Sequence, residues 1–157
     1  MAHAQAKVRQ VQFDVANRLF FRLYQCSNLM HKNGTRYMGE LGSTTQQWAV
    51  LGALARPLVL EKGMSVKDLI EFLLLSRQNL TAVLDRLEGR GWIERAKDED
   101  DGRAKRIRLT VAGRAVWARM LQRIETFYVD SLSSLSDQDQ LLLYQLLDRL
   151  KGSLSAL

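Results

Sequence analysis

Two short capped helices, followed by a switch from helical to strand periodicity, constrain the fold of this chain more than any other feature. Ser65 precedes the stretch VKDLIEFLL, and Ser76 precedes NLTAVLDRLEG after a break at Leu75. Serine is a preferred N-cap residue, and Gly89 or Gly91 can end the second helix. Two helices joined by so short a turn are typical of the helix-turn-helix.

The segment after the second helix changes its pattern. GWIERA and RIRLT are short, and in the second of them Ile107 and Leu109 alternate with arginines, which is the period of a strand. Between them lies a charged stretch, residues 98–105, in which acids come first and bases follow. These features predict a β-hairpin, so the helix-turn-helix is expected to be winged.

Capping residues mark three further helix starts: Thr44 with Gln47, Thr110, and Ser136 with Asp139. The first of these helices is expected to end around Arg56-Pro57, and the residues EKGM at 61–64 to form a turn. The other two are long, VAGRAVWARMLQRIETFYVDSL and DQDQLLLYQLLDRLKGSL. The sequence therefore predicts a mainly α protein with a small β-hairpin wing.

Residues 8–31 are predicted to form a helix that is apolar on two sides. One stripe consists of Val8, Val11, Val15, Leu19, Cys26, Leu29 and Met30, and a second, nearly opposite stripe of Phe13, Phe20 and Tyr24. A small domain offers one interior, so the second side is expected to meet another subunit.

Composition narrows the class of protein. The 157 residues are 46% hydrophobic, and the formal charge is +6. Such a chain can form one folded domain, and its basic balance favours a polyanionic partner, with an acidic membrane surface or simple solubility as alternatives. Cys26 is the only cysteine, and no apolar run approaches the ~18 residues of a membrane span. We expect a cytoplasmic protein that uses no disulfide, metal, cofactor or membrane segment.

The second helix of the pair presents a short polar face. Its apolar residues cluster on one side: Leu80, Val83, Leu84 and Leu87. The polar residues are candidates for contact with double-stranded DNA: Arg77, Gln78, Asn79, Thr81 and Arg86. Gln and Asn can pair with adenine, Arg with guanine or phosphate, and Thr with a phosphate or a thymine methyl. Any amphipathic surface helix has such a face, however, and Asp85 opposes phosphates unless it pairs with an arginine or reads a cytosine.

The hairpin tip adds further candidates. Arg103 and Lys105 can reach a neighbouring minor groove, whose negative potential attracts an inserted arginine. Asp101, two residues before Arg103, is placed to hold that guanidinium in one orientation. The tip is therefore expected to contribute a DNA contact in addition to those of the helix.

With these features the chain resembles the MarR family of bacterial winged-helix regulators over nearly its whole length. The most specific motif is the family's wing signature, here Asp101-Gly102-Arg103, Leu109-Thr110 and Gly113. Many members carry a second arginine in place of Gly102, so one wing contact is expected to be missing. The resemblance implies an intertwined homodimer that binds a pseudo-palindromic operator and usually represses transcription. It also implies one domain over 1–157, with dimerisation helices at 8–31 and 114–157 and a winged helix-turn-helix lobe at 44–110.

The resemblance further implies a small-molecule pocket between these two regions, often for phenolic or aromatic carboxylate compounds. Arg22 lies within the main apolar stripe of the first helix, where it must reach solvent or find an anion: a ligand carboxylate, or an internal Asp or Glu. Other candidates to line the pocket are Arg18, Tyr24, His31 and Trp48, although aromatic residues at helical spacing are more often core. Some members sense peroxide through a cysteine, but a thiol on an apolar stripe, such as Cys26, is usually inert.

The prediction is thus a dimeric regulator, a repressor released from DNA by a small aromatic ligand. The alternative is a winged-helix interaction module that never touches DNA, against which the basic wing argues. An enzyme is not expected, because the sequence has no Gly-rich phosphate loop, nucleophile elbow or paired carboxylates in a cleft.

Overall fold

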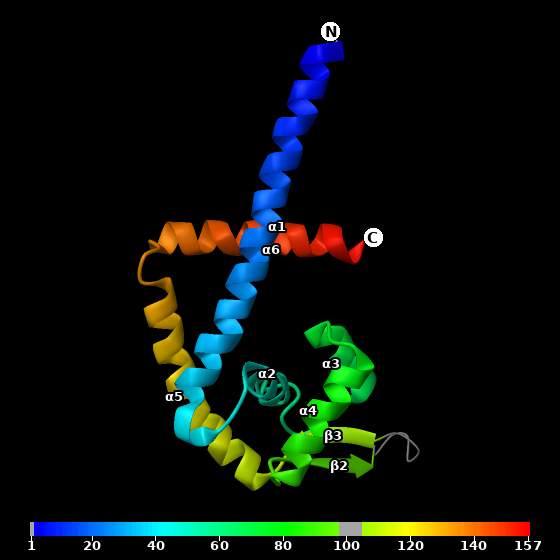
Figure 1. Ribbon diagram of the computed structural model, residues 1–157. Coiled ribbons are helices and arrows are strands. Elements are labelled where there is room, and N and C mark those ends of the chain that lie inside the picture. Colours follow the sequence, from blue (N-terminus) through cyan, green and yellow to red (C-terminus); the bar gives the residue numbers. More distant parts are fainter. Residues whose placement is uncertain (1, 98–104) are drawn as a thin grey trace.

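The structure is a computed structural model that describes residues 2–97 and 105–157 (Figure 1). A long helix, α1 (Ala2–Met38), leaves a small lobe toward the N-terminus, and α6 (Asp137–Ser155) runs across it in this view. The α5 helix (Val111–Leu132) leads from the lobe to α6. The lobe contains η1 (Gly39–Leu41), α2 (Thr45–Leu54), β1 (Met64–Ser65), α3 (Val66–Leu73), α4 (Arg77–Gly89), β2 (Ile93–Lys97) and β3 (Lys105–Leu109). The predicted mainly α, winged helix-turn-helix fold is confirmed.

The sheet has three antiparallel strands in the order β1-β3-β2, one more than the predicted hairpin. β2 and β3 pair along their length, and Met64 of β1 pairs with Ile107 on the other side of β3. The prediction that residues 61–64 form only a turn was therefore wrong at Met64. Gly63, in the left-handed region (φ +70°), lets the chain approach β3, because a Cβ there would lie 2.6 Å from the Arg108 side chain. A strand of two residues is too short for alternation to reveal it in the sequence.

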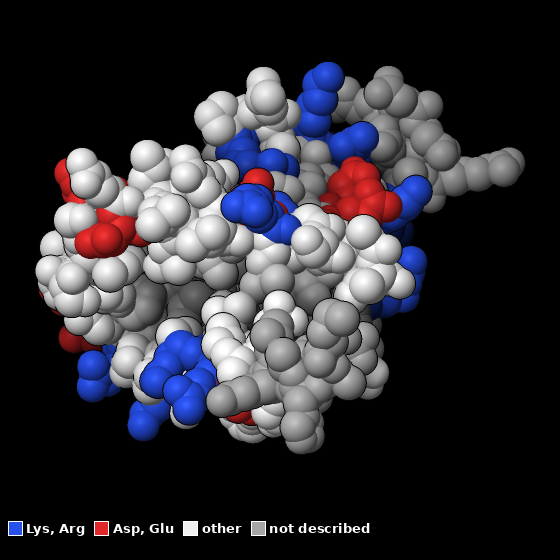
Figure 2. Space-filling model, turned by 90° about the horizontal axis from the view of Figure 1, so that it is seen from above, with Lys and Arg blue, Asp and Glu red and all other residues white. Residues whose placement is uncertain are grey.

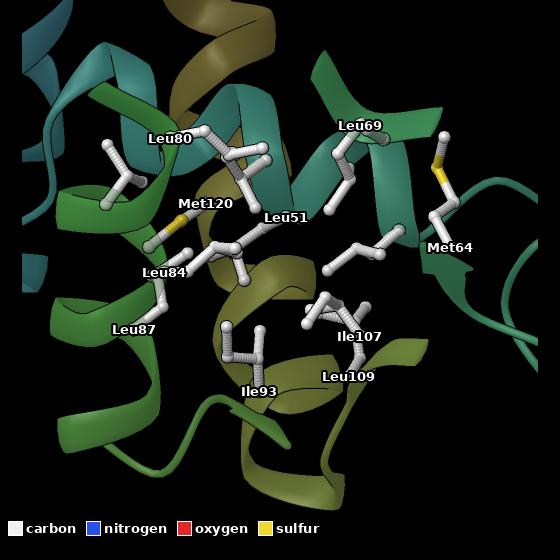
Figure 3. Close-up of a cluster of buried hydrophobic side chains, with 14 of the residues drawn as sticks. Leu51, Met64, Leu69, Leu80, Leu84, Leu87, Ile93, Ile107, Leu109 and Met120 are labelled. Carbon is white, nitrogen blue, oxygen red and sulfur yellow. The ribbon is translucent and has the colours of Figure 1, made fainter. Parts of the chain in front are cut away.

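The core lies where the helix-turn-helix packs against the sheet (Figure 3). All four residues predicted as the apolar side of α4 are buried: Leu80, Val83, Leu84 and Leu87. They belong to one cluster with buried residues from the other elements of the lobe and from α5, among them Leu51, Leu69, Ile93, Ile107, Leu109 and Met120. Burying a leucine or isoleucine side chain contributes roughly 1.5–3 kcal/mol. This packing directs one face of α4 inward and leaves the opposite face to solvent.

Helix starts were predicted better than helix ends. Each predicted cap accepts a backbone N–H bond: Thr44 from Gln47, Ser65 from Asp68, Ser76 from Asn79, Thr110 from Gly113 and Ser136 from Asp139. By contrast, α2 ends at Leu54, before the expected Arg56-Pro57, and α3 ends at Leu73 with Leu74 in the left-handed region (φ +54°). Neither end is followed by the glycine that usually marks a helix C-terminus, so the sequence carried little signal there.

The first helix differs most from its prediction. It extends over Ala2–Met38 instead of 8–31, and both apolar stripes are exposed in the single chain: Val11, Phe13, Val15, Leu19, Phe20, Tyr24, Leu29 and Met30. Cys26 is exposed as well. The expectation that one stripe packs into the chain's own core was wrong, because within residues 10–38 the buried positions are Gly34 and Met38, near the end of the helix.

The Ser136 cap of α6 has a measurable electrostatic consequence. The Asp139 carboxylate accepts hydrogen bonds from the Ser136 hydroxyl (2.6 Å) and backbone N–H (3.1 Å), which lower the pKa of Asp139 below its ordinary value of 3.8. Ser136→Ala should raise that pKa toward the ordinary value in an NMR titration. A lowered carboxyl pKa contributes stability above pH 3.8 that is lost as pH falls through the folded-state pKa. Wild type should therefore lose more stability than the variant on acidification below about pH 4, and an unchanged Asp139 pKa would contradict this.

Candidate nucleic-acid interface

The α4 helix carries the candidate contact residues on its outer face. The Ser76 hydroxyl accepts the Asn79 N–H (3.2 Å) and so begins the helix, while the buried leucines fix its rotation. All five polar residues predicted on this helix are exposed: Arg77, Gln78, Asn79, Thr81 and Arg86. Four of them lie within the first two turns, where a helix entering a major groove meets the base edges.

Thr81 is restricted by a bond within its own helix. Its hydroxyl donates to the Arg77 carbonyl oxygen (2.8 Å). A threonine hydroxyl has one proton, and phosphate oxygens only accept hydrogen bonds. Of the two predicted roles, contact with a thymine methyl therefore fits this geometry better than donation to a phosphate.

The acidic residues of α4 are paired with a single arginine of the sheet. Arg95 Nη2 lies 2.7 Å from Asp85 Oδ1, and Arg95 Nε lies 2.9 Å from Glu88 Oε2. Of the two alternatives expected for Asp85, an arginine partner or a cytosine contact, the structure has the first, and the arginine belongs to β2. Exposed ion pairs contribute little stability one at a time. Here one guanidinium bridges both acids, offsets one of their two negative charges and ties the second half of α4 to the sheet.

The wing is described in part. Lys105 is exposed at the start of β3, directly opposite Lys97 of β2. The predicted residues Asp101 and Arg103 lie outside the described residues. Lys97 was missed by sequence reasoning, although the register of the predicted hairpin would have placed it opposite Lys105. Two lysines therefore face each other at the described end of the wing.

The next two basic residues of β3 point elsewhere. Arg106 Nη1 donates to the Gly63 carbonyl oxygen (3.1 Å), and Arg108 Nη1 lies 3.5 Å from the Glu61 carbonyl oxygen. Glu61 also pairs with Arg114 of α5 (3.1 Å). These contacts hold the turn before β1 against β3 and α5. Arg106 and Arg108 therefore have a structural role in addition to their positive charge.

The single chain brings two of the five predicted ligand residues to the same helix crossing. His31 Nδ1 lies 2.5 Å from Thr45 Oγ1, and Trp48 packs so closely on α1 that a Cβ at Gly34 would lie 2.8 Å from its ring. His31 and Trp48 thus both lie at the crossing of α1 and α2. The other three, Arg18, Arg22 and Tyr24, are exposed further along α1, at least seven residues or about 10 Å from His31. Arg22 is directed to solvent in the single chain, so the predicted internal acid is not needed.

An aromatic cluster lies beside this crossing and was not predicted as a unit. Phe127 contacts Tyr37, Trp48 and Tyr128, with ring centroids 5.3 to 6.0 Å apart. The Tyr37 hydroxyl donates to Asp130 (2.6 Å), and this bond raises the pKa of Tyr37; burial raises the pKa of Tyr128. The rings come from α1, α2 and α5, so only the tertiary structure brings them together.

Two hollows adjoin the long helices. One of about 210 Å³ has a mixed polar and apolar lining, formed by Asn33, Arg36, Tyr37, Phe127, Asp130 and Ser131. The other, of about 490 Å³, is apolar and open, and is lined by Leu23 of α1, Leu74, and the α6 residues Leu147, Leu150, Lys151, Leu154 and Ser155. The second hollow places the turn of the helix-turn-helix next to α1 and α6.

The arrangement offers surfaces for binding. Among residues 2–97 and 105–157, no three His, Cys, Asp or Glu residues are grouped so as to hold a metal ion. No helix in the same ranges is both long and apolar enough to cross a membrane. What the described residues do present is an exposed polar helix face beside a basic strand end.

Comparisons with known proteins agree with this geometry. Residues 41–104 match the sequence pattern of the MarR family. The chain is 49% identical over 129 residues to the transcriptional activatory protein BadR of Rhodopseudomonas palustris, covering 82% of this chain and 73% of that protein. A probable transcriptional regulator from Pseudomonas aeruginosa superposes with a TM-score of 0.76 at 31% identity, covering 87% and 98% of the two chains. Reduced AbfR, solved bound to DNA, superposes with a TM-score of 0.71 at 28% identity, covering 94% and 98%.

Proposed function

Because this chain belongs to the MarR family of transcriptional regulators, we propose that it binds a pseudo-palindromic operator as a homodimer and that a small aromatic ligand changes its affinity for DNA. The observation that carries the proposal is the outer face of α4. Its first two turns expose residues of the types that can contact base edges, Arg77, Gln78, Asn79 and Thr81, and Arg95 partly offsets the acids that would repel phosphates.

The proposed dimer uses α1 and α6. Both helices expose many large apolar side chains, on α6 notably Leu141, Leu142, Leu143, Leu146 and Leu147. The view from above in Figure 2 is dominated by uncharged surface, with charged side chains gathered in separate clusters. Exposed large apolar side chains gathered in this number on two helices of a folded chain mark an interface. A second copy supplies the same surface and so covers both.

The proposed division of the chain follows from this. Residues 8–31 and 114–157 form the dimerisation region, and residues 44–110 form the winged helix-turn-helix lobe. The first turns of α5 belong to both, since Val116 and Met120 are buried in the lobe core. A rigid α5 therefore connects the DNA-reading lobe to the dimer platform.

The proposed ligand is a small phenolic or aromatic acid that binds beside the aromatic cluster at the crossing of α1, α2 and α5. His31 and Trp48 lie at this crossing, with Phe127 and Tyr128 next to them. Aromatic side chains favour contact with a flat ring, and imidazole supplies a polar group for a hydroxyl or carboxylate. Thermal-shift measurements against phenolic acids, followed by operator release, test this site; hits that bind Trp48→Ala equally well would place the ligand elsewhere.

Operator binding is tested by fluorescence anisotropy on DNA upstream of the gene, in competition with a scrambled duplex. The expected result is a preference for one site and an affinity that falls steeply with salt, about one log unit per decade for each phosphate neutralised. An interaction module that never uses DNA would show no preference over the scrambled competitor. That outcome would replace the proposal by the interaction-module alternative.

Thr81 provides a sharper test of how the helix reads its site. Thr81→Val keeps the methyl group and removes a hydroxyl already bonded to Arg77, so operator affinity should change by less than about twofold. Thr81→Ser keeps the hydroxyl and removes the methyl, and should cost about 1 kcal/mol at a site that contains the matching thymine. Uracil in place of that thymine should abolish the difference between wild type and Thr81→Ser. Loss of binding in Thr81→Val alone would instead indicate a contact through the hydroxyl.

The direction of regulation is a separate part of the proposal. The general resemblance to the family predicts repression, in which ligand binding releases the operator. The R. palustris relative is described as activatory, and this favours activation as a second candidate. A reporter fused to the target promoter decides between them, since deleting the regulator raises expression under repression and lowers it under activation.

A further inference from the structure

The connection between α1 and the lobe contains a glycine at each end. Gly39 (φ +40°) begins η1 and Gly42 (φ +58°) follows it, both in the left-handed region. No neighbouring atom lies within 4 Å of where a Cβ of Gly39 would sit. Glycine explores backbone conformations more freely than other residues, so the segment GELG at 39–42 has the character of a hinge.

The side chain of the residue that follows α4 is hydrogen-bonded to this hinge. Arg90, the residue after α4, donates from Nη2 to the Gly42 carbonyl oxygen (2.8 Å) and from Nη1 to the Leu41 carbonyl oxygen (3.3 Å). Its guanidinium also lies over the Trp92 ring, 4.6 Å from the centroid. The two carbonyls stand 48 and 49 residues away in the sequence. A planar guanidinium can make both bonds and the ring contact at once, which a point-like ammonium does less well.

We propose that Arg90 is a positioning residue that locks the GELG hinge and thereby sets the separation of the two recognition helices α4 in the dimer. The inference rests on the proposed function, because only a dimer joined through α1 and α6 has such a separation. Successive half-sites on DNA lie one helical turn, roughly 34–36 Å, apart, and each base pair changes this distance by about 3.4 Å. A small rotation of the lobe at the hinge therefore changes which spacing of half-sites the dimer accepts.

The geometry of the contact argues for positioning over direct binding of DNA. Both donors of Arg90 that face the hinge already serve backbone carbonyls, and the face of the guanidinium covers Trp92. The base-reading residues lie at the opposite end of α4. The two hydrogen bonds join Arg90, directly after α4, to the segment 39–42 between α1 and α2. They therefore connect α4 to α1, which carries part of the proposed dimer surface.

The test compares wild type with Arg90→Ala on operators whose half-sites are moved apart or together by one base pair. Wild type should prefer the natural spacing by about tenfold or more, whereas Arg90→Ala should reduce that preference to roughly twofold, because two charge-assisted hydrogen bonds are lost. Arg90→Lys keeps the charge and should recover only part of the preference. Lys32→Ala, which removes one positive charge from an exposed position of α1 outside both the proposed dimerisation region and the lobe, is the matched control and should leave the preference intact.

The salt dependence separates the proposal from a phosphate contact. The slope of log affinity against log salt should be the same in wild type and Arg90→Ala. A slope smaller by about one, with an unchanged spacing preference, would identify Arg90 as a phosphate ligand and overturn the proposal. Should Arg90→Ala not fold, Arg90→Gln, which also removes the charge, decides by the same two measurements.

A spin-label distance measurement without DNA distinguishes a wrong role for Arg90 from a wrong proposed function. Labels at Ala82→Cys, in a Cys26→Ser background, report the distance between the two α4 helices. Arg90→Ala should broaden the distance distribution, and an equally narrow distribution in both proteins would overturn the lock while leaving the dimer in place. The absence of any distance between protomers would overturn the dimer, and the inference with it.

Discussion

Replacing Gly113 with alanine should unfold the lobe or destabilise it by roughly 3 kcal/mol or more, the largest stability effect expected of a single methyl group in this chain. Gly113 lies in the first turn of α5, and a Cβ there would overlap the Trp92 carbonyl oxygen and lie 2.8 Å from the Trp92 carbonyl carbon. Backbone atoms cannot rotate away as a side chain can. The Trp92 carbonyl also accepts the Thr110 N–H (3.1 Å), which holds the two segments together.

The measurement is the free energy of unfolding from urea denaturation followed by circular dichroism. Gly89→Ala in α4 is the matched control, because no atom lies within 4 Å of its Cβ position and alanine has the higher helix propensity. That control should be neutral or slightly stabilising. Since natural domains are stable by only about 5–15 kcal/mol, the Gly113 variant should be visibly less soluble or unfolded. A Gly113→Ala protein as stable as wild type would show that the approach of α5 to Trp92 is looser than described.

Leu146→Glu in α6 should weaken dimerisation by about 100-fold or more and abolish operator binding at concentrations where wild type binds. Leu146 is 48% exposed in the single chain, so a lone subunit would tolerate glutamate there at little cost. In an intertwined dimer the same position is covered, and burying an unpaired carboxylate costs several kcal/mol. The substitution should therefore have little effect on a protein that is a lone subunit and a large effect on a protein that is a dimer.

Sedimentation equilibrium gives the dissociation constant, and anisotropy gives operator affinity in the same samples. Leu58→Glu makes the same change at a position of the lobe that is 93% exposed, and should leave both quantities nearly unchanged. If Leu146→Glu remains a dimer with wild-type affinity, α6 does not form the interface. If Leu146→Glu remains a dimer but no longer binds DNA, Leu146 instead helps to connect the dimerisation region to the winged helix-turn-helix lobe.

The sequence by itself determined where helices start, which side of α4 faces inward and to which family the chain belongs. Each N-cap depends on a residue and a backbone N–H two or three positions away, as in Ser76 with Asn79. The burial of Leu80, Leu84 and Leu87 follows from helical spacing alone. Such interactions are local, so the order of residues suffices to predict them, and the polar candidates on α4 emerge on the outer face for the same reason.

Contacts between residues distant in the sequence were decided only by the tertiary structure. Sequence reasoning placed Arg22 and Cys26 near an interior, but the structure places them on an exposed length of α1. β1, the pairing of Arg95 with two acids of α4, and the Arg90 lock each join segments whose approach no local pattern encodes. Periodicity tells which side of a helix is apolar, whereas what covers that side depends on how whole elements pack. For α1 and α6 the proposed cover is a second chain.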